Sequence, residues 1–234
     1  MKGSREYSQK LRKLYRALKS GYARPQPASY DDPLEALVHG ILSEKISESQ
    51  AQSALKRFSD YFIDMNDLRV SRTEEIVEVL GGDVSTGRDV ALTLTRVLKA
   101  VFDKYNTVSL RSLKKMGKKP ARQAIERLEG VSPFVRDYCT LTSLQGHAIP
   151  LTKTMLDYLR GQELVHPEAD DRQIEGFLAR QISADKAYEF YALLRRESES
   201  PRAARKKKTT RKTKVRTRTK AAKKKKTTTR KMKK

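Results

Sequence analysis

Apolar residues recur along most of this chain at spacings of three and four positions, which is the period of an amphipathic helix. Segment 8–19 places Leu11, Leu14 and Leu18 on one face and basic residues elsewhere. No segment alternates apolar and polar residues as a half-buried strand does. We therefore predict an all-α fold. The segments predicted to be helical are 8–19, 33–42, 47–58, 73–80, 90–105, 121–128, one from 133 that Gly146 closes, 154–159, 171–181 and 185–195.

Proline, glycine and capping residues divide these segments. Pro25 and Pro27 mark residues 22–30 as a linker. Asp32 precedes Pro33, and an acidic N-cap followed by proline at the first helical position is a helix start. The glycine pair at 81–82 ends the helix before it, because glycine tolerates the conformation found after helix C-termini. The chain is expected to be helical almost throughout.

The stretch from residue 128 to residue 159 organises the rest of the chain. Gly130 lies in a tight turn, Ser132 stands at an N-cap position, and Pro133 occupies the first helical position. A helix, a short glycine turn and a second helix with an open N-terminus form a helix-hairpin-helix, which can hold a DNA phosphate at the positive end of the helix dipole. We expect Gly130, Val131 and Ser132 to contact DNA.

Charge is distributed unevenly. Of the 51 Lys and Arg residues, 19 follow residue 200, where no acidic residue occurs, so 32 basic and 28 acidic residues precede them. The C-terminal segment 201–234 (the basic tail) lacks the apolar residues of a core and is expected to be disordered. Its composition favours phosphate contacts with double-stranded DNA, largely independent of sequence, over a role in solubility or localisation alone. The tail residues expected to contact DNA include Lys206, Lys207, Lys208, Lys223, Lys224, Lys225 and Lys226.

Cysteine and histidine usage argues against a cofactor. Cys139 is the single cysteine, so neither an intramolecular disulfide nor a four-cysteine iron–sulfur cluster can form, and its apolar surroundings predict burial. The three histidines show no metal-ligand spacing.

No apolar run approaches the roughly 18–20 residues that span a bilayer, and no signal peptide is recognised. We expect a monomer without cofactor, metal or membrane contact, cytoplasmic and nucleoid-associated, or nuclear in a eukaryote.

The central stretch resembles the endonuclease III-like superfamily of helix-hairpin-helix DNA glycosylases, whose pattern is L-P-G-V-G-x-K-T-A followed by V-D-T-H. Leu128, Gly130 and Val131 match the first pattern, and Ile149 to Leu151 lead into the second. The resemblance spans about residues 30–197. It implies the short type without an iron–sulfur cluster, with two lobes. One lobe is discontinuous (1–30 plus 147–200), and the other (31–146) carries the hairpin.

The resemblance places both catalytic positions on residues of the wrong chemistry. The Schiff-base lysine falls on Phe134 and the catalytic aspartate on Thr152, with the family's separation of 18 residues kept. Lys153 is the fallback amine. The nearby Asp137 and Asp157 are expected to face solvent or a capping partner. Because no carboxylate or amine stands at the family positions, no catalytic residue is predicted.

Other positions of the resemblance are altered as well. The second hairpin glycine is Ser132 and the hairpin proline is Glu129, whose charge opposes a phosphate. Residues 42–45 are similar to the family's leucine–serine–glutamine motif, so Glu44 and Lys45 are expected at the DNA. The two lysines before Pro120, Lys118 and Lys119, are expected to form a basic surface.

Two functions of different classes follow. The first is a non-catalytic DNA-binding protein, a degenerate relative of base-excision-repair DNA glycosylases anchored by the basic tail. The second is an active DNA glycosylase or abasic-site lyase that uses non-standard residues. A helical scaffold for protein interaction, localised by its tail, is a third. The missing lysine and aspartate favour the first.

Overall fold

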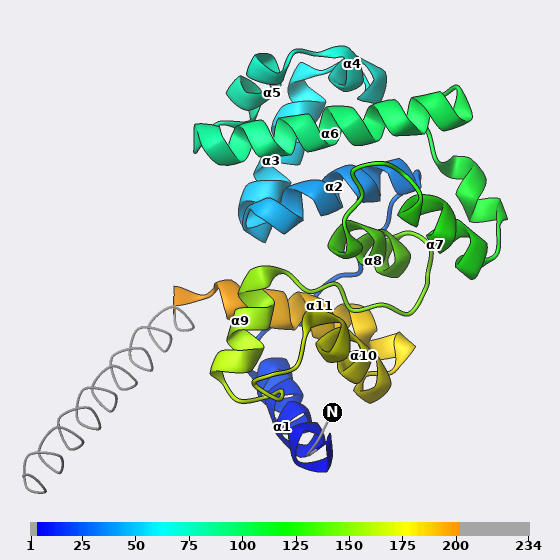
Figure 1. Cartoon of the computed structure of the whole chain (residues 1–234). Coiled ribbons are helices and arrows are strands. Elements are labelled where there is room, and N and C mark those ends of the chain that lie inside the picture. The colour runs from blue at the N-terminus through cyan, green and yellow to red at the C-terminus, as the bar shows by residue number, and fades with distance from the viewer. Residues whose placement is uncertain (1–3, 202–234) are drawn as a thin grey trace, which may run out of the picture.

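The computed structural model describes residues 4–201, and every regular element in that range is a helix. The elements are α1 (Ser4–Gly21), α2 (Pro33–Lys45), α3 (Glu48–Tyr61), α4 (Met65–Val70), α5 (Thr73–Leu80), α6 (Val84–Tyr105), the 3₁₀ helix η1 (Arg111–Lys115), α7 (Lys118–Glu126), α8 (Pro133–Thr142), α9 (Lys153–Gly161), α10 (Asp171–Gln181) and α11 (Ala184–Glu199). The helices form two lobes (Figure 1). The predicted all-α, two-lobed class is confirmed. The disorder predicted for the basic tail concerns residues that, from 202 on, lie outside the described range.

One lobe contains α2 to α8, and the other contains α1 together with α9, α10 and α11 (Figure 1). The first helix therefore packs on the last. Tyr15 of α1 donates a hydrogen bond to Glu189 of α11, and Tyr22 donates one to Glu197 at 2.7 Å. The linker predicted at 22–30 has no regular structure and runs between the lobes. The domain boundaries after residues 30 and 146 stay predictions.

Side-chain caps place helix starts that apolar spacing alone does not predict. α6 begins at Val84 instead of residue 90, because Asp83 Oδ2 accepts a hydrogen bond from the Thr86 amide at 2.7 Å. α4 was not predicted; it begins after Asp64, whose carboxylate accepts from two amides of the first turn. A helix of six residues with one buried leucine is too short for periodicity to reveal.

Other predicted boundaries were wrong by a few residues. α1 spans 4–21 instead of 8–19, and α9 begins at Lys153 instead of residue 154. α7 begins at Lys118, three residues before the predicted start, with Pro120 inside its first turn, where proline is tolerated. α8 ends at Thr142, before Gly146. The capped starts at Pro33 and Pro133 agree with the prediction.

α2 is the central helix of the larger lobe. Ten of its 13 residues are buried, and it packs against α3, α6 and α8. A helix that is apolar on most of its circumference must be covered on all sides. Gly40 lets α8 approach closely, because a Cβ atom there would lie 3.3 Å from the Tyr138 ring. This approach brings Tyr138 of α8 against His39 of α2.

Cys139, the next residue on α8, is buried as predicted, and burial raises the pKa of its thiol. A raised pKa keeps the sulfur protonated and unreactive. Among the described helices, none has the length and apolarity needed to cross a membrane.

Candidate functional site

The hairpin between α7 and α8 has the geometry that the sequence predicts. Gly130 has φ of +85°, and a Cβ atom there would lie 3.0 Å from Val97 of α6, so glycine is required both by conformation and by space. Ser132 is the N-cap of α8, and its Oγ accepts a hydrogen bond from the Val135 amide at 3.1 Å. The Val131 amide donates to Leu128 O at 3.3 Å, so it serves the turn and is not free for a phosphate.

A cluster of ion pairs around one buried carboxylate connects the two helices of the hairpin. Asp137 is 5% exposed and accepts hydrogen bonds from Arg122 of α7 at 2.9 Å and from Arg136 at 2.8 Å. Arg136 also donates to Glu126 at 2.9 Å. The hydrogen bond to Asp137 raises the pKa of Arg136. The expectation that Asp137 faces solvent or a capping partner was wrong: this carboxylate joins the two helices of the hairpin.

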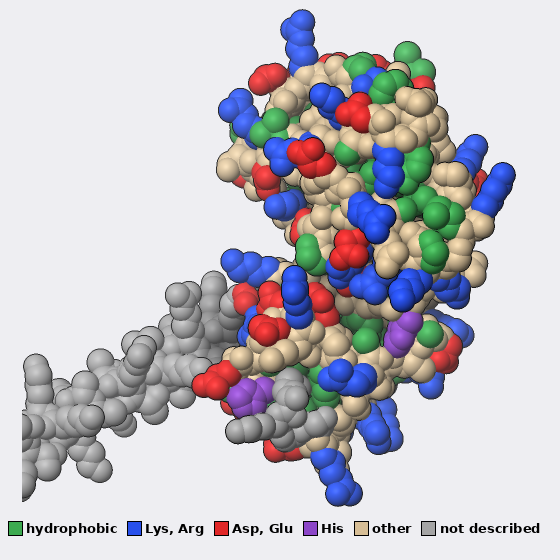
Figure 2. All heavy atoms as spheres, turned by 45° about the vertical axis from the view of Figure 1, so that its right-hand side comes forward, with side chains coloured by type: hydrophobic (Ala, Val, Ile, Leu, Met, Phe, Trp, Pro, Cys, Tyr) green, Lys and Arg blue, Asp and Glu red, His purple; other side chains and the backbone are tan. Residues whose placement is uncertain are grey.

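The predicted basic positions are at the surface, and some have protein partners. Lys118 and Lys119 are exposed at the start of α7, where Lys118 Nζ donates to Gln145 O at 2.6 Å. Lys45 forms an ion pair with Asp89 of α6 at 2.8 Å, and Glu44 beside it is partly buried. On the face that Figure 2 shows, Lys and Arg side chains are spread over both lobes and interleaved with acidic ones. The tail lysines lie outside the described residues.

The two family positions for catalysis serve packing and capping here. Phe134 is 5% exposed, stacks on Tyr138 with ring centroids 6.1 Å apart, and has the Arg195 guanidinium 6.0 Å from its ring centroid. Thr152 is 6% exposed, and its Oγ1 accepts from the Met155 amide at 3.3 Å as the N-cap of α9. Lys153, the fallback amine, is exposed at the first position of α9.

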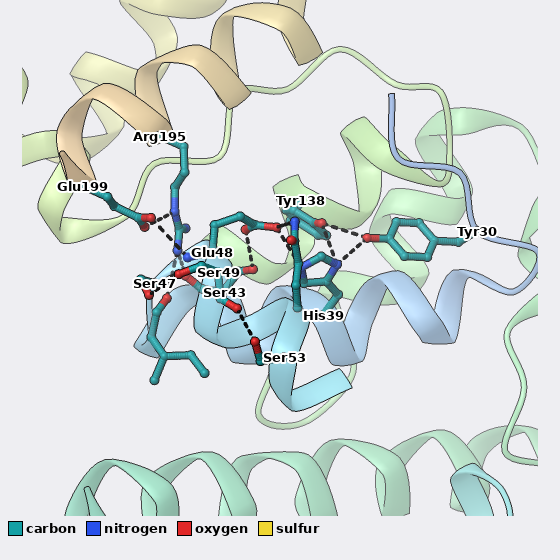
Figure 3. A network of polar contacts seen from close by, with 12 residues as sticks. Tyr30, His39, Ser43, Ser47, Glu48, Ser49, Ser53, Tyr138, Arg195 and Glu199 are labelled. Carbon is teal, nitrogen blue, oxygen red and sulfur yellow. Dashed lines mark hydrogen bonds and ion pairs between the residues drawn. The ribbon is translucent and has the colours of Figure 1, made fainter. Parts of the chain in front are cut away.

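A polar network that sequence reasoning missed includes Tyr138, on which Phe134 stacks. Figure 3 shows this network. His39 Nε2 is 3.0 Å from Glu48 Oε1, and its Nδ1 is 2.6 Å from the Tyr30 hydroxyl and 3.1 Å from the Tyr138 hydroxyl. The two tyrosine hydroxyls are 2.8 Å apart. Ser43 Oγ donates to the second oxygen of Glu48 at 3.0 Å. The network joins the linker, α2, α3 and α8.

Arg195 of α11 fastens the second lobe to this network. Its Nη2 donates to the carbonyl oxygens of Ser43 at 2.6 Å and Ile46 at 2.9 Å, at the C-terminal end of α2. Its Nε donates to Glu199, whose other oxygen accepts from the Glu48 amide at 3.1 Å. The positive charge of this guanidinium, beside the helix-terminal carbonyls, also interacts favourably with the negative end of the α2 dipole.

Glu48, Arg195 and Glu199 border a cavity of about 540 Å³ between the lobes (the interlobe cavity). Its walls come from the linker, the start of α3, the middle of α8 and residues 188–199 of α11. Tyr138 is in the wall, whereas Phe134 and Thr152 are not. The lining residues are Pro25, Gln26, Glu48, Ser49, Gln52, Tyr138, Tyr188, Tyr191, Ala192, Arg195, Arg196 and Glu199.

The Glu48 carboxylate of this cavity is held in its charged form. Burial by itself raises the pKa of Glu48, but the hydrogen bonds from His39 and Ser43 and the charge of Arg195 outweigh burial and lower that pKa to about 2. Burial raises the pKa of Tyr138 and of Tyr191, so both hydroxyls keep their protons. The cavity therefore combines the ionised Glu48 with protonated phenols.

Within residues 4–201 no three His, Cys, Asp or Glu side chains come together as metal ligands would. His39 and Glu48 bind each other, and His147 Nε2 lies 2.9 Å from Ile182 O.

No protein-family model matches the chain, and no curated protein matches it by sequence. Solved structures do match in fold. A non-covalent complex of endonuclease III with DNA is 15% identical with a TM-score of 0.64, over 80% of this chain and 84% of that one. A thermostable thymine-DNA glycosylase is 14% identical with a TM-score of 0.61, over 83% and 89% of the two chains.

The 3-methyladenine DNA glycosylase of H. pylori, solved with 1,N6-ethenoadenine, is 13% identical with a TM-score of 0.57, over 82% of this chain and 94% of that one. The chain thus has the helix-hairpin-helix DNA glycosylase fold, as the hairpin residues predict. Identities this low show the fold alone.

Proposed function

We propose that this protein binds double-stranded DNA without performing the family's chemistry, and that the basic tail anchors it. The observation that carries the proposal is the state of the two family positions. Phe134 is packed under Arg195, and the hydroxyl of Thr152 is used to cap α9. A glycosylase needs a carboxylate to stabilise positive charge on the sugar, and a lyase needs an amine for the Schiff base. Neither group stands at these positions.

The hairpin supports the binding half of the proposal. Gly130 and Ser132 keep the turn and the N-cap, so α8 presents its positive dipole end at the surface. The buried Asp137 and its two arginines connect the helices of the hairpin. Exposed Lys118 and Lys119 add positive charge at the start of α7. Glu129 in the turn opposes a phosphate, so we propose that the hairpin contributes modest affinity.

We propose that affinity comes mainly from the charge of the basic tail. The basic tail carries 19 cations and no anion, which favours binding that is independent of sequence. We propose a monomer that needs no cofactor and is located on the nucleoid, or in the nucleus of a eukaryote.

An active DNA glycosylase or abasic-site lyase is the alternative, and one observation favours it. Lys153 is exposed directly after Thr152, and the ionised Glu48 lies in a cavity between the lobes. Lys153 is exposed, however, whereas a lysine that forms Schiff bases is activated by a desolvated pocket or a cationic neighbour. The carboxylate of Glu48 is already occupied by hydrogen-bond donors.

The test uses duplexes that carry an abasic site, a damaged base or neither, with binding and strand cleavage measured on the same samples. We expect binding to all three, no excision, and no adduct trapped by borohydride. An adduct that disappears in Lys153→Ala would overturn the proposal and make Lys153 the nucleophile. Lys186→Ala, another exposed lysine that follows a helix start, is the matched control.

A further inference from the structure

We propose that the outward face of α1 is a second phosphate-binding surface, through which the folded body joins a second DNA duplex to the one at the hairpin. The inference rests on the proposed function, because it takes DNA as the anion that this protein binds. It adds a surface that the hairpin and the basic tail do not include. Four cations form this surface (the α1 face), namely Arg5, Arg12, Arg16 and Lys19.

Positive charge within residues 1–200 is concentrated on α1. These residues include 32 basic and 28 acidic ones. α1 holds six of the basic residues and a single acidic one, Glu6. The remainder is therefore close to neutral, with 26 basic and 27 acidic residues. Another long helix, α11, has three basic and four acidic residues. A general surplus of surface cations thus does not explain the charge of α1.

The α1 face lies opposite the side of the helix that packs on the protein. Its four cations follow one another at spacings of seven, four and three residues, which places them on one stripe, and all four are exposed. Leu11 and Leu18, on the other side, are 1% and 3% exposed, and α1 packs on α11. The hydrogen bond from Tyr15 to Glu189 also joins these two helices. The cations are therefore presented by a helix that is fixed to the fold.

Three cations of the α1 face are free to bind an anion. Lys19 forms an ion pair with Glu189 at 3.6 Å, whereas Arg5, Arg12 and Arg16 form none with any described residue. The planar guanidinium group suits phosphate, because two of its N–H groups can donate in parallel to two phosphate oxygens. At 1.5 Å per residue, the α1 face is about 21 Å long, which is the length of roughly six base pairs.

The α1 face and the hairpin belong to different lobes. α1 lies in the smaller lobe with α9, α10 and α11, whereas α7 and α8 of the hairpin lie in the larger one. In Figure 1, α10 and α11 lie between α1 and the hairpin. Figure 2 shows Lys and Arg side chains that project from the lower end of the smaller lobe, where α1 is the lowest helix of Figure 1. One folded body therefore has two separate surfaces for phosphate.

An anionic membrane is the other large surface that a basic helix can bind. Amphipathic helices bind membranes by burying their apolar face among the lipids. The apolar face of α1 is already used, because Leu11 and Leu18 are buried where α1 packs on α11. Only the charged face is available, which favours the phosphate backbone of DNA over a bilayer.

The α1 variant of the full chain, with Arg5→Gln, Arg12→Gln and Arg16→Gln, tests the surface. Glutamine is a good helix former, so thermal unfolding should be unchanged. Two duplexes, one with a donor and one with an acceptor fluorophore, report bridging by energy transfer, and anisotropy of a single labelled duplex reports binding alone. Each lost phosphate contact lowers the slope of log affinity against log salt by about 1, so we expect the slope for bridging to fall by roughly 3. Binding of a single duplex should change little.

The control variant, with Lys56→Gln, Arg72→Gln and Lys186→Gln, loses the same charge from exposed positions on α3, before α5 and on α11. We expect it to bridge two duplexes as the native chain does. An equal loss of bridging in the two variants would overturn the inference, because net charge alone would then explain the effect.

Other outcomes separate this inference from the proposed function. A native chain that binds one duplex but does not bridge two would overturn the inference and leave the proposed function standing, whereas a chain that binds no duplex would overturn both. Vesicles that contain phosphatidylserine test the membrane. If the α1 variant loses vesicle binding but still bridges duplexes normally, the α1 face binds lipid and its assignment to DNA is wrong.

Discussion

His39 Nε2 lies 3.0 Å from Glu48 Oε1, and this contact joins α2 to the first residue of α3. Ser43 Oγ holds the other carboxylate oxygen at 3.0 Å. The ionised Glu48 therefore connects the two helices across the turn between them. Arg195, from the other lobe, binds carbonyl oxygens at the same turn. A partly buried carboxylate with this many donors is a fixed part of the fold.

Glu48→Gln should lower stability in a pH-dependent manner. The lowered pKa of Glu48, about 2 against an ordinary 4.5, means that its charge stabilises the folded state above about pH 4.5 and that this contribution is lost as pH falls toward 2. The shift corresponds to roughly 3 kcal/mol. Urea unfolding followed by circular dichroism should show that difference at neutral pH and a smaller one near pH 3. Glu44→Gln, at a partly exposed glutamate, is the control, with an expected change within about 0.5 kcal/mol. A difference for Glu48→Gln that is constant with pH would contradict the assigned ionisation.

Gly130→Ala should destabilise the hairpin through two separable effects. Its φ of +85° strains any residue with a Cβ atom, and the added atom would lie 3.0 Å from Val97. Gly81→Ala tests the positive φ alone, because the space beside Gly81 is open. Gly21→Ala is the control, because Gly21 has open space and an ordinary φ. We expect losses of about 2 kcal/mol or more, about 1 kcal/mol, and none, in that order. Thermal unfolding measures the series, and equal losses at 130 and 81 would show that the contact with α6 is unimportant.

Asp137→Asn should loosen the hairpin. The buried carboxylate is shared by Arg122 and Arg136, and removing its charge leaves the partly buried Arg136 with only Glu126 as an ionic partner. Breaking a buried pair costs about 3–5 kcal/mol, and the partial exposure of Arg122 reduces this to about 2–3 kcal/mol.

Glu129→Gln, in the exposed turn, should leave stability unchanged and strengthen DNA binding by a tail-deleted chain, because it removes an anion beside the expected phosphate. Denaturant titration and fluorescence anisotropy measure the two effects.

The hairpin could be predicted because the residues that specify it are adjacent in the sequence. The cavity could not be predicted, because residues far apart in the sequence form it. Ser132 and Pro133 specify a helix start within two residues, and Gly130 specifies the turn, so their structure follows from positions that are adjacent in sequence. Arg195 is 152 residues from Ser43, and nothing local to either residue indicates that they meet. His39 and Glu48 are nine residues apart and lie on different helices, so helical periodicity does not predict that they meet. Asp137 was misplaced for a similar reason, because its partner Arg122 comes from the neighbouring helix.

Phe134→Lys should be poorly tolerated, although the resemblance places a lysine there. The side chain is buried, and the Arg195 guanidinium lies 6.0 Å from its ring centroid, so a lysine would bring a second cation into a site with little water. We expect a loss of about 3 kcal/mol or more, against about 1 kcal/mol for the apolar control Phe134→Leu.

Thr152→Asp should be neutral or stabilising, because aspartate is a good N-cap for α9. A stable double variant that traps an abasic-site adduct would show that the family's site survives here.

DNA binding should depend steeply on salt, and that dependence should reside in the basic tail. Each phosphate contact made by Lys or Arg releases condensed counterions, so the slope of log affinity against log salt counts the contacts. If the tail makes about 6–10 contacts, affinity should fall by about 10³–10⁵ between roughly 50 and 200 mM salt. Deleting residues 202–234 removes 19 of the 51 basic residues and should flatten the slope. Anisotropy titrations of the full and truncated chains measure both slopes. A truncated chain that still prefers gapped or abasic duplexes would locate the remaining affinity at the hairpin, through Gly130 and Ser132. Equal affinity and equal slope in the two chains would show that the tail does not anchor the protein.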